Sequence, residues 1–341
     1  MLKKAIAFVL ISTLIIGGVV AGYLYHVYQQ VVASTVDISE PALIQIERGD
    51  TLRSFLREQK AMERIEADWP FRIFLKQHPE FAHIKVGTYR ISPGEPWTDV
   101  FRRLVDGDVL TYKVTFIEGW TFREFRRALT EAEYLQQTIA ELSDAEVIQL
   151  LGSDELEHPE GWFYPDTYLY PHGAKDIDVL QRAHSKMQQV LAQAWKERGD
   201  AIQVESPYEA LILASIIEKE TAVDEERQAI SGVFTRRLKR GMRLQTDPTV
   251  IYGMGQRYDG NIRRRDLKED TPYNTYVHSG LPPTPIANPG SASIHAALHP
   301  ESGSTLYFVA LGDGSGRHYF SKSLKEHNRA VRRYLNNRRN R

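Results

Sequence analysis

Apolar positions along the chain first gather in one uninterrupted run near the N-terminus. Residues 5–25 contain no charged side chain, and Lys3 and Lys4 precede them. About 20 apolar residues are enough for a helix to cross the hydrocarbon core of a membrane. We therefore predict a transmembrane anchor over residues 5–25. The short tail of residues 1–4 should stay in the cytoplasm, because lysines favour that side.

A cleaved signal peptide is the alternative for this segment, since Val19, Val20 and Ala21 resemble a cleavage site weakly. Signal peptides have a shorter apolar region, about 7–15 residues, which favours the uncleaved anchor. The remainder of the chain is then expected outside the bacterial cytoplasmic (inner) membrane, in the periplasmic or extracytoplasmic space, as a single-pass membrane protein.

A strand–turn–helix pattern follows and recurs along the chain. The segment GDTLRSF (49–55) aligns with GWTFREF (119–125), and a looser copy begins at Gly94. Gly-Asp-Thr-Leu between a strand and a helix resembles LysM modules, which bind glycans that contain N-acetylglucosamine. The resemblance implies a LysM-like α+β domain over residues 41–112. A small α+β packing domain without a ligand is the alternative.

Residues 113–337 mix short strands with amphipathic helices, which predicts an α+β fold for this second domain. The apolar run 306–311 and the segment 318–321 flank the turn sequence GDGSG, as expected for a hairpin. The stretch 160–170 holds five aromatic side chains within nine residues. Such a stretch suits either the wall of a sugar-binding groove or a core strand followed by a turn.

One carboxylate interrupts the apolar side of the helix predicted from residue 208. Leu211, Ala214, Ser215 and Glu218 recur at helical spacing, whereas Glu220 should point elsewhere. Burial at the edge of a core favours the neutral carboxyl, which is the state that a general acid needs. The alternative is an ordinary surface glutamate whose stem packs while its head group meets water.

Composition narrows the chemistry. The net charge of −1 gives no reason to expect a nucleic-acid partner, and the lack of cysteine excludes disulfides and thiolate metal sites. The eleven histidines form no HExxH pattern. We therefore predict neither a metal nor a cofactor.

Several motifs together resemble the YceG-like family of endolytic murein transglycosylases. They run in family order through the chain: EGWFYPDTY, LASIIEKETA, RLQTDPTVIYGMG, YNTY, GLPP, ANPG and LYFVA. The resemblance implies cleavage of the β-1,4 bond between N-acetylmuramic acid and N-acetylglucosamine in nascent peptidoglycan. Cleavage would leave 1,6-anhydromuramoyl ends and terminate elongation of the glycan strand. The resemblance also places the catalytic glutamate on Glu218. It implies that the protein acts together with peptidoglycan synthases, the penicillin-binding proteins.

Polar groups near these motifs are our candidates for positioning the glycan: Tyr170, Gln245, Asp247, Tyr252, Asn274 and Asn288. Two other functions stay open at this point. A muramidase-type hydrolase would need a second carboxylate, for which Asp247 or Asp166 would serve. A non-catalytic scaffold would bind peptidoglycan while Glu218 only packed.

Overall fold

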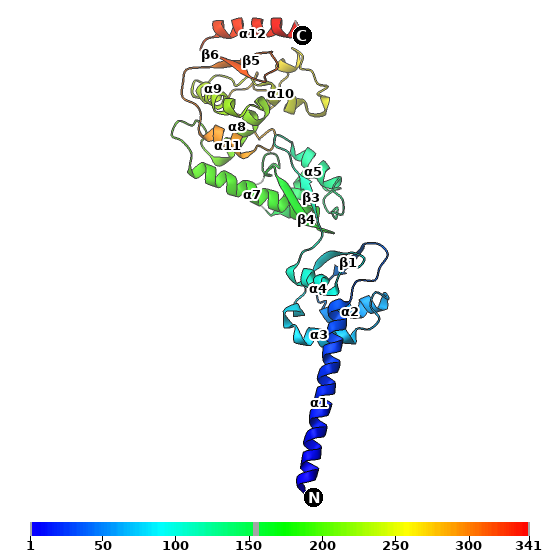
Figure 1. Cartoon of the computed structure of the whole chain (residues 1–341). Helices are drawn as coiled ribbons and strands as arrows, with labels where there is room; N and C mark the ends of the chain where they lie inside the picture. Colours follow the sequence, from blue (N-terminus) through cyan, green and yellow to red (C-terminus); the bar gives the residue numbers. More distant parts are fainter. Residues whose placement is uncertain (1, 153–156, 340–341) are drawn as a thin grey trace. The chain divides into compact units, whose positions relative to one another are not determined.

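The computed structural model describes residues 2–152 and 157–339, and they form two compact units (Figure 1). Unit 1 comprises Met1–Tyr112 with Pro171–Gly173, and unit 2 comprises Lys113–Tyr170 with Ala174–Arg341. Helices and two-stranded sheets occur in both units, so the predicted α+β class is confirmed.

Helix α1 (Leu2–Ala33) opens unit 1 and is longer than the predicted anchor. Among the described residues it is the one helix long and apolar enough to cross a membrane. Its first part exposes apolar side chains, including Phe8 and Leu14, whereas Val27 and Val31 are buried. The helix therefore continues past residue 25 because its last turns pack against the folded part of unit 1.

A small antiparallel sheet organises the rest of unit 1. Strand β1 (Ala42–Ile46) pairs with β2 (Gly87–Ile91), with Ile44 opposite Tyr89. Helices α2 (Leu52–Ala61), α3 (Trp69–Gln77) and α4 (Trp97–Asp106) and the 3₁₀ turn η1 (Pro79–Ala82) complete it.

The recurring sequence pattern reflects the start of a helix. The Thr51 side chain accepts a hydrogen bond from the backbone N–H of Ser54, and the Ser54 hydroxyl accepts one from the backbone N–H of Thr51. Thr121 and Glu124 form the same capping box at the second copy. This reciprocal cap satisfies backbone donors that a helix start leaves unpaired. The LysM-like assignment of residues 41–112 stays a prediction.

Unit 2 packs its helices around the long central helix α8 (Pro207–Glu220), which lies against α11 (Ser291–Leu298). Strands β3 (Thr111–Thr115) and β4 (Thr167–Pro171) form one sheet, and β5 (Tyr307–Ala310) and β6 (His318–Ser321) form another. The remaining helical elements are α5 (Phe122–Thr130), α6 (Asp144–Leu151), α7 (Asp176–Lys196), η2 (Asp224–Glu226), α9 (Arg227–Lys239), α10 (Asp247–Met254), η3 (Gly255–Arg257), η4 (Asp266–Lys268) and α12 (Leu324–Arg339).

The aromatic stretch 160–170 belongs to the core of unit 2. Trp162, Phe163 and Tyr168 are buried, and Tyr170 is 1% exposed. The Tyr170 hydroxyl donates to the backbone oxygen of Glu133 at 2.8 Å. The structure therefore gives Tyr170 a packing role and does not support direct contact with a glycan.

Candidate active site

Two glutamates at the C-terminal end of α8 face different surroundings. The helix starts at Ser206, whose side chain accepts from the N–H of Glu209, and continues through a buried apolar run to Glu220. Residues two apart on a helix point about 200° away from each other. Glu218 and Glu220 therefore meet different parts of unit 2, although they share one helix.

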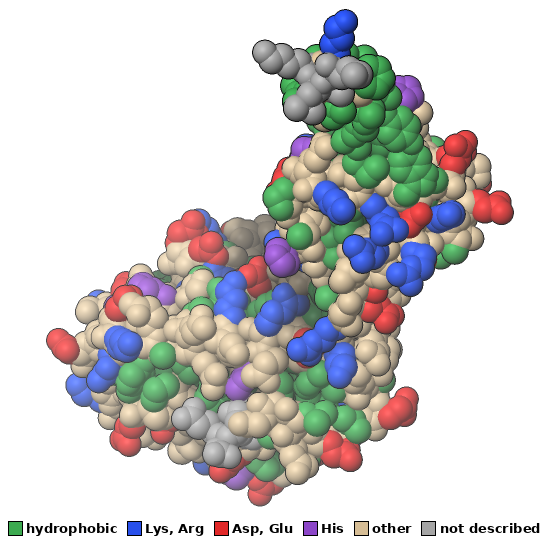
Figure 2. Space-filling model, turned by 90° about the horizontal axis from the view of Figure 1, so that it is seen from below, with side chains coloured by type: hydrophobic (Ala, Val, Ile, Leu, Met, Phe, Trp, Pro, Cys, Tyr) green, Lys and Arg blue, Asp and Glu red, His purple; other side chains and the backbone are tan. Residues whose placement is uncertain are grey.

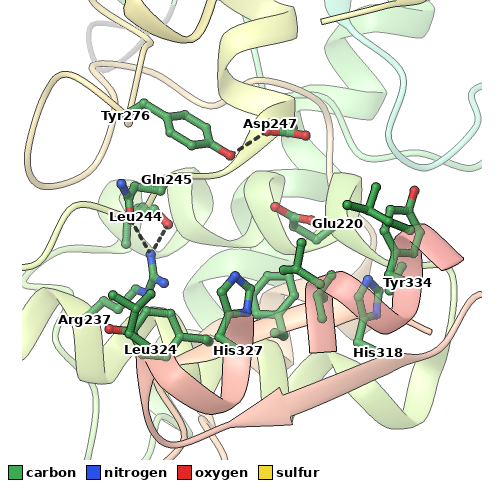
Figure 3. A pocket seen from close by; sticks show the side chains of 16 residues that line it. Glu220, Arg237, Leu244, Gln245, Asp247, Tyr276, His318, Leu324, His327 and Tyr334 are labelled. Atoms are coloured by element: carbon green, nitrogen blue, oxygen red, sulfur yellow. Dashed lines mark hydrogen bonds between the residues drawn. The ribbon is translucent and has the colours of Figure 1, made fainter. Parts of the chain in front are cut away.

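Glu220 lines a cavity of about 580 Å³. Figure 3 shows its carboxyl group directed into this space, with Asp247 and Tyr276 above it and His327 below. The walls come from the end of α8, the loop before α10, the β5–β6 hairpin and α12: Glu220, Arg237, Leu244, Gln245, Asp247, Tyr276, Tyr307, Phe308, Val309, Ala310, His318, Leu324, His327, Val331, Tyr334 and Leu335. A cavity of this size and lining is typical of ligand sites in proteins.

The surroundings of Glu220 hold its carboxyl group in an unusual state. Desolvation and the negative charge of Asp247 raise the pKa of Glu220, the hydrogen bond from Thr246 lowers it, and the net pKa is about 7. The Thr246 hydroxyl donates to Glu220 Oε1. A carboxyl group with a pKa near 7 is protonated about half of the time at neutral pH, so it can give up a proton there.

Asp247 is the first residue of α10 and is solvent-exposed. It accepts a hydrogen bond of 2.6 Å from the Tyr276 hydroxyl. Burial, together with this hydrogen bond and the charge of Asp247, raises the pKa of Tyr276 above its ordinary value, so the phenol stays neutral and keeps donating. Asp247 is thus a carboxylate held in place at the cavity rim.

Arg237 supports the opposite wall of the cavity. Its guanidinium donates to the backbone oxygens of Leu306 at 2.7 Å and Leu244 at 2.8 Å. It also reaches the Gln245 side chain at 3.4 Å and lies 5.0 Å from the ring centre of Tyr307. Gln245 has a φ of 52°, in the left-handed region that residues other than glycine seldom adopt. Arg237 therefore fixes the loop that presents Gln245 and Asp247.

Glu218 lies outside this cavity lining, in a compact charged cluster. Its Oε2 accepts from the N–H of Gly290 at 3.0 Å, and its Oε1 is 3.7 Å from the Arg227 guanidinium. The Glu218 and Arg227 side chains are only 7% and 8% exposed. Arg227 also donates to Ser293 at 3.2 Å. Glu218 thus joins the end of α8 to the loop before α11.

A second carboxyl group, Glu118, lies beside this cluster. Partial burial raises the pKa of Glu118, and the charge of Glu218 raises it further. A side chain added at Gly290 would collide with the Glu118 carboxylate, since an ideal Cβ there would lie 1.9 Å from it. The absence of a side chain at Gly290 lets Glu118 and Glu218 approach the same backbone segment.

Three of the remaining predicted residues, Tyr252, Asn274 and Asn288, form hydrogen bonds inside unit 2. The Tyr252 hydroxyl donates to Glu160 at 3.0 Å, and burial raises the pKa of Glu160 to about 7. Asn288 is fully buried, accepts from the N–H of Phe163 at 3.0 Å and donates to Glu160 at 3.3 Å. Asn274 is 1% exposed and donates to the backbone oxygen of Glu269 at 2.7 Å.

Of the residues predicted from sequence, Gln245 and Asp247 lie together in the cavity, whereas Tyr170, Glu218, Tyr252, Asn274 and Asn288 do not line it. Sequence reasoning did not select Glu220, Arg237, Tyr276 and His327. The helical spacing of Glu218 with small apolar residues correctly predicted that the Glu218 side chain is buried. It could not show that Thr246, 26 positions further on, would meet Glu220.

Groups of three or more His, Asp and Glu side chains that could hold a metal ion were not found among the described residues. The expectation of a metal-free, cofactor-free site stays a prediction.

Comparison with known proteins relates the chain to one family. The model of the YceG-like family matches residues 44–333. A Bacillus subtilis protein named endolytic murein transglycosylase is 32% identical over 308 residues, covering 86% of this chain and 84% of that protein. A Streptococcus pneumoniae protein of the same name is 26% identical, and the match spans 54% of its length and 78% of this chain.

The fold also matches a solved structure. The crystal structure of a yceG-like protein from Listeria monocytogenes superposes with a TM-score of 0.53 at 28% sequence identity. The match covers 86% of this chain and 99% of that one.

Proposed function

The chain belongs to the YceG-like family, and we propose on that premise that it is an endolytic lytic transglycosylase of murein. The observation that carries the chemistry is the partly buried Glu220 carboxyl group, which is directed into a cavity large enough for sugar rings and accepts a hydrogen bond from Thr246. A pKa of about 7 lets this group donate a proton near neutral pH. Its substrate is the β-1,4 bond between N-acetylmuramic acid and N-acetylglucosamine.

One acid is enough for this reaction. Glu220 gives its proton to the oxygen that leaves C1 of the muramic acid as the glycosidic bond breaks. The carboxylate then takes the proton from the C6 hydroxyl of the same sugar while that oxygen bonds to C1. The proton count balances, Glu220 returns to its starting state, and a 1,6-anhydro end is left. A hydrolase would instead require a second carboxylate to act as nucleophile or to activate water.

Glu218, the glutamate predicted from sequence, remains the alternative acid. Its carboxylate is engaged by Arg227 and by the Gly290 N–H, and it does not line the cavity that Glu220 faces. The interpretation of Glu218 as the catalytic acid stays a prediction. With Glu220 as the acid, Glu218 would hold the loop that ends at Gly290 against α8. Replacing each glutamate by glutamine separates the two assignments.

Asp247 and Gln245 are the proposed substrate-positioning residues, since both lie at the cavity beside Glu220. Asp247 is also the residue that a hydrolase would use. The product decides between the functions: anhydro ends support the lyase, reducing ends support the hydrolase, and intact strands support a binding scaffold. Mass spectrometry of digested nascent peptidoglycan measures all three outcomes.

We further propose that α1 anchors the enzyme in the cytoplasmic membrane, with residues 1–4 inside and the rest of the chain outside. Lys4 and the apolar surface of α1 support this orientation. Protease added to spheroplasts should then degrade everything beyond the anchor, and protection of unit 2 would contradict the orientation. The same placement would bring the catalytic domain (113–337) near peptidoglycan synthases, with the LysM-like segment (41–112) as a glycan-binding module.

A further inference from the structure

The position of α1 sets the depth at which unit 1 meets the membrane. The hydrocarbon core is about 30 Å thick, which corresponds to about 20 helical residues at about 1.5 Å each. Counted from the residue after Lys4, the core ends near Leu24. Val27 is already 1% exposed because it is packed within unit 1. The folded part of unit 1 that follows α1 therefore begins within one helical turn of the membrane boundary.

Helix α3 runs beside α1 in the same direction across this boundary. Trp69, at the start of α3, stacks on Tyr23 with ring centres 6.3 Å apart and planes 9° apart. Phe74, five residues further on, meets Tyr28 at 5.5 Å. Trp69 consequently lies at the level of Tyr23, where the lipid head groups begin. It is 43% exposed, so the indole ring is accessible to a membrane interface, where tryptophan is favoured.

Two cations flank Trp69. Asp68 directly precedes it, and the Lys60 ammonium and the Arg72 guanidinium each lie 4.0 Å from the Asp68 carboxylate. Their side chains are 52% and 51% exposed, so these long ion pairs are weak and leave both cations accessible. In Figure 2, Lys and Arg side chains gather at the foot of the apolar helix α1.

We propose that these four residues, Tyr23, Lys60, Trp69 and Arg72, form a collar that binds anionic phospholipid head groups of the outer leaflet. The proposal rests on α1 spanning the membrane. Trp69 and Tyr23 would lie at the level of the glycerol groups, where amphipathic rings are favoured. Lys60 and Arg72 would contact lipid phosphates, and the negative surface potential of an anionic leaflet would strengthen these contacts. The collar would fix the folded part of unit 1 against the bilayer.

Fluorescence quenching tests the depth of Trp69. The full-length protein is reconstituted into vesicles whose phospholipids carry bromine on the acyl chains close to the head group. The chain has five tryptophans, so the difference between wild type and Trp69→Phe isolates Trp69. We expect a larger quenched fraction in wild type than in Trp69→Phe. Equal quenched fractions would overturn the proposal.

A second comparison tests the lipid charge. Vesicles of phosphatidylcholine alone are compared with vesicles that also contain phosphatidylglycerol. Quenching of Trp69 should increase with phosphatidylglycerol in wild type, and this increase should be lost in a Lys60→Gln, Arg72→Gln double variant. Arg102→Gln, which removes an exposed cation of α4 paired with Asp99, is the control and should keep the increase. An unchanged increase in the double variant would refute the role of the two cations.

Discussion

Replacement of Glu220 by glutamine is the most direct test of the proposed chemistry. The amide keeps the shape of the side chain and can still accept the hydrogen bond from Thr246, but it has no proton to transfer. Loss of a general acid lowers a rate by about 10²–10⁴-fold, equivalent to about 2.7–5.5 kcal/mol of transition-state stabilisation. Binding of glycan should be retained, because the cavity walls are unchanged.

The pKa of Glu220 also predicts how strongly the cleavage rate depends on pH. At pH 7 a carboxyl group with a pKa of about 7 is about half protonated, whereas one at the ordinary 4.5 would be about 0.3% protonated. The shift is worth about 3 kcal/mol and gives roughly 150-fold more of the active acid. Because the protonated form is the active one, cleavage should fall about tenfold between pH 6 and pH 8.

The assay measures release of 1,6-anhydro ends from nascent glycan by mass spectrometry, with glycan binding followed in parallel. Glu218→Gln is the matched control on the same helix. It should keep measurable cleavage and the same decline with pH. Cleavage by Glu220→Gln at a near-normal rate, with collapse in Glu218→Gln at every pH, would refute the assignment and restore Glu218 as the acid.

Other predictions follow from the same contacts. Asp247→Asn removes a charge that raises the pKa of Glu220, so the decline in activity should begin at lower pH while anhydro ends persist; loss of all cleavage would indicate a hydrolase. Glu160 has a pKa near 7 against 4.5 in the unfolded chain, so the folded state keeps a proton that the unfolded state releases. Stability should therefore fall by up to about 3 kcal/mol as pH rises from 4.5 to about 7, and Glu160→Gln should flatten this slope in thermal unfolding. Gly161→Ala should cost about 2 kcal/mol or more, because φ is +86° and the new Cβ would lie 2.5 Å from Pro285, so an unchanged melting temperature would contradict the packing. Deletion of residues 41–112 should weaken glycan binding but leave a folded unit 2 with measurable cleavage.

Local sequence signals predicted the elements well, because each depends on near neighbours. Thr51 and Thr121 mark helix starts through capping boxes that span three residues. The hairpin of β5 and β6 follows from two apolar strands and a glycine-rich turn between them. The apolar run after Lys4 predicted the long apolar helix α1, although its last turns could not be foreseen, since Val31 is buried by side chains from distant segments.

The site was less predictable, because long-range contacts decide which polar groups face the cavity. The helical periodicity correctly placed Glu218 on the apolar side of α8. It could not show that Arg227, a buried arginine of α9, would form an ion pair with the Glu218 carboxylate. Glu220 is distinguished by Thr246 and Asp247, which only the folded chain brings to it. Asn274 and Asn288 resembled substrate ligands because they are amides in a loop rich in proline. In the fold their donors and acceptors are used internally.

Glu218→Gln carries a further expectation that separates structural from catalytic loss. Arg227 is 8% exposed and would lose a charged partner, while Gly290 would keep an acceptor in the amide oxygen. Breaking a buried ion pair by removing one partner commonly costs about 3–5 kcal/mol; Asp224, which also pairs with Arg227, should reduce this loss. The variant should therefore melt at a lower temperature and lose activity in proportion to the unfolded fraction, with its decline with pH unmoved. The Glu220→Gln variant should show the opposite pattern, with a normal or higher melting temperature and no cleavage. It removes a carboxyl group whose ionised form is unfavourable in the cavity. A Glu218→Gln protein that melts like wild type yet cleaves nothing would show that the charged cluster, and not the cavity, holds the reaction.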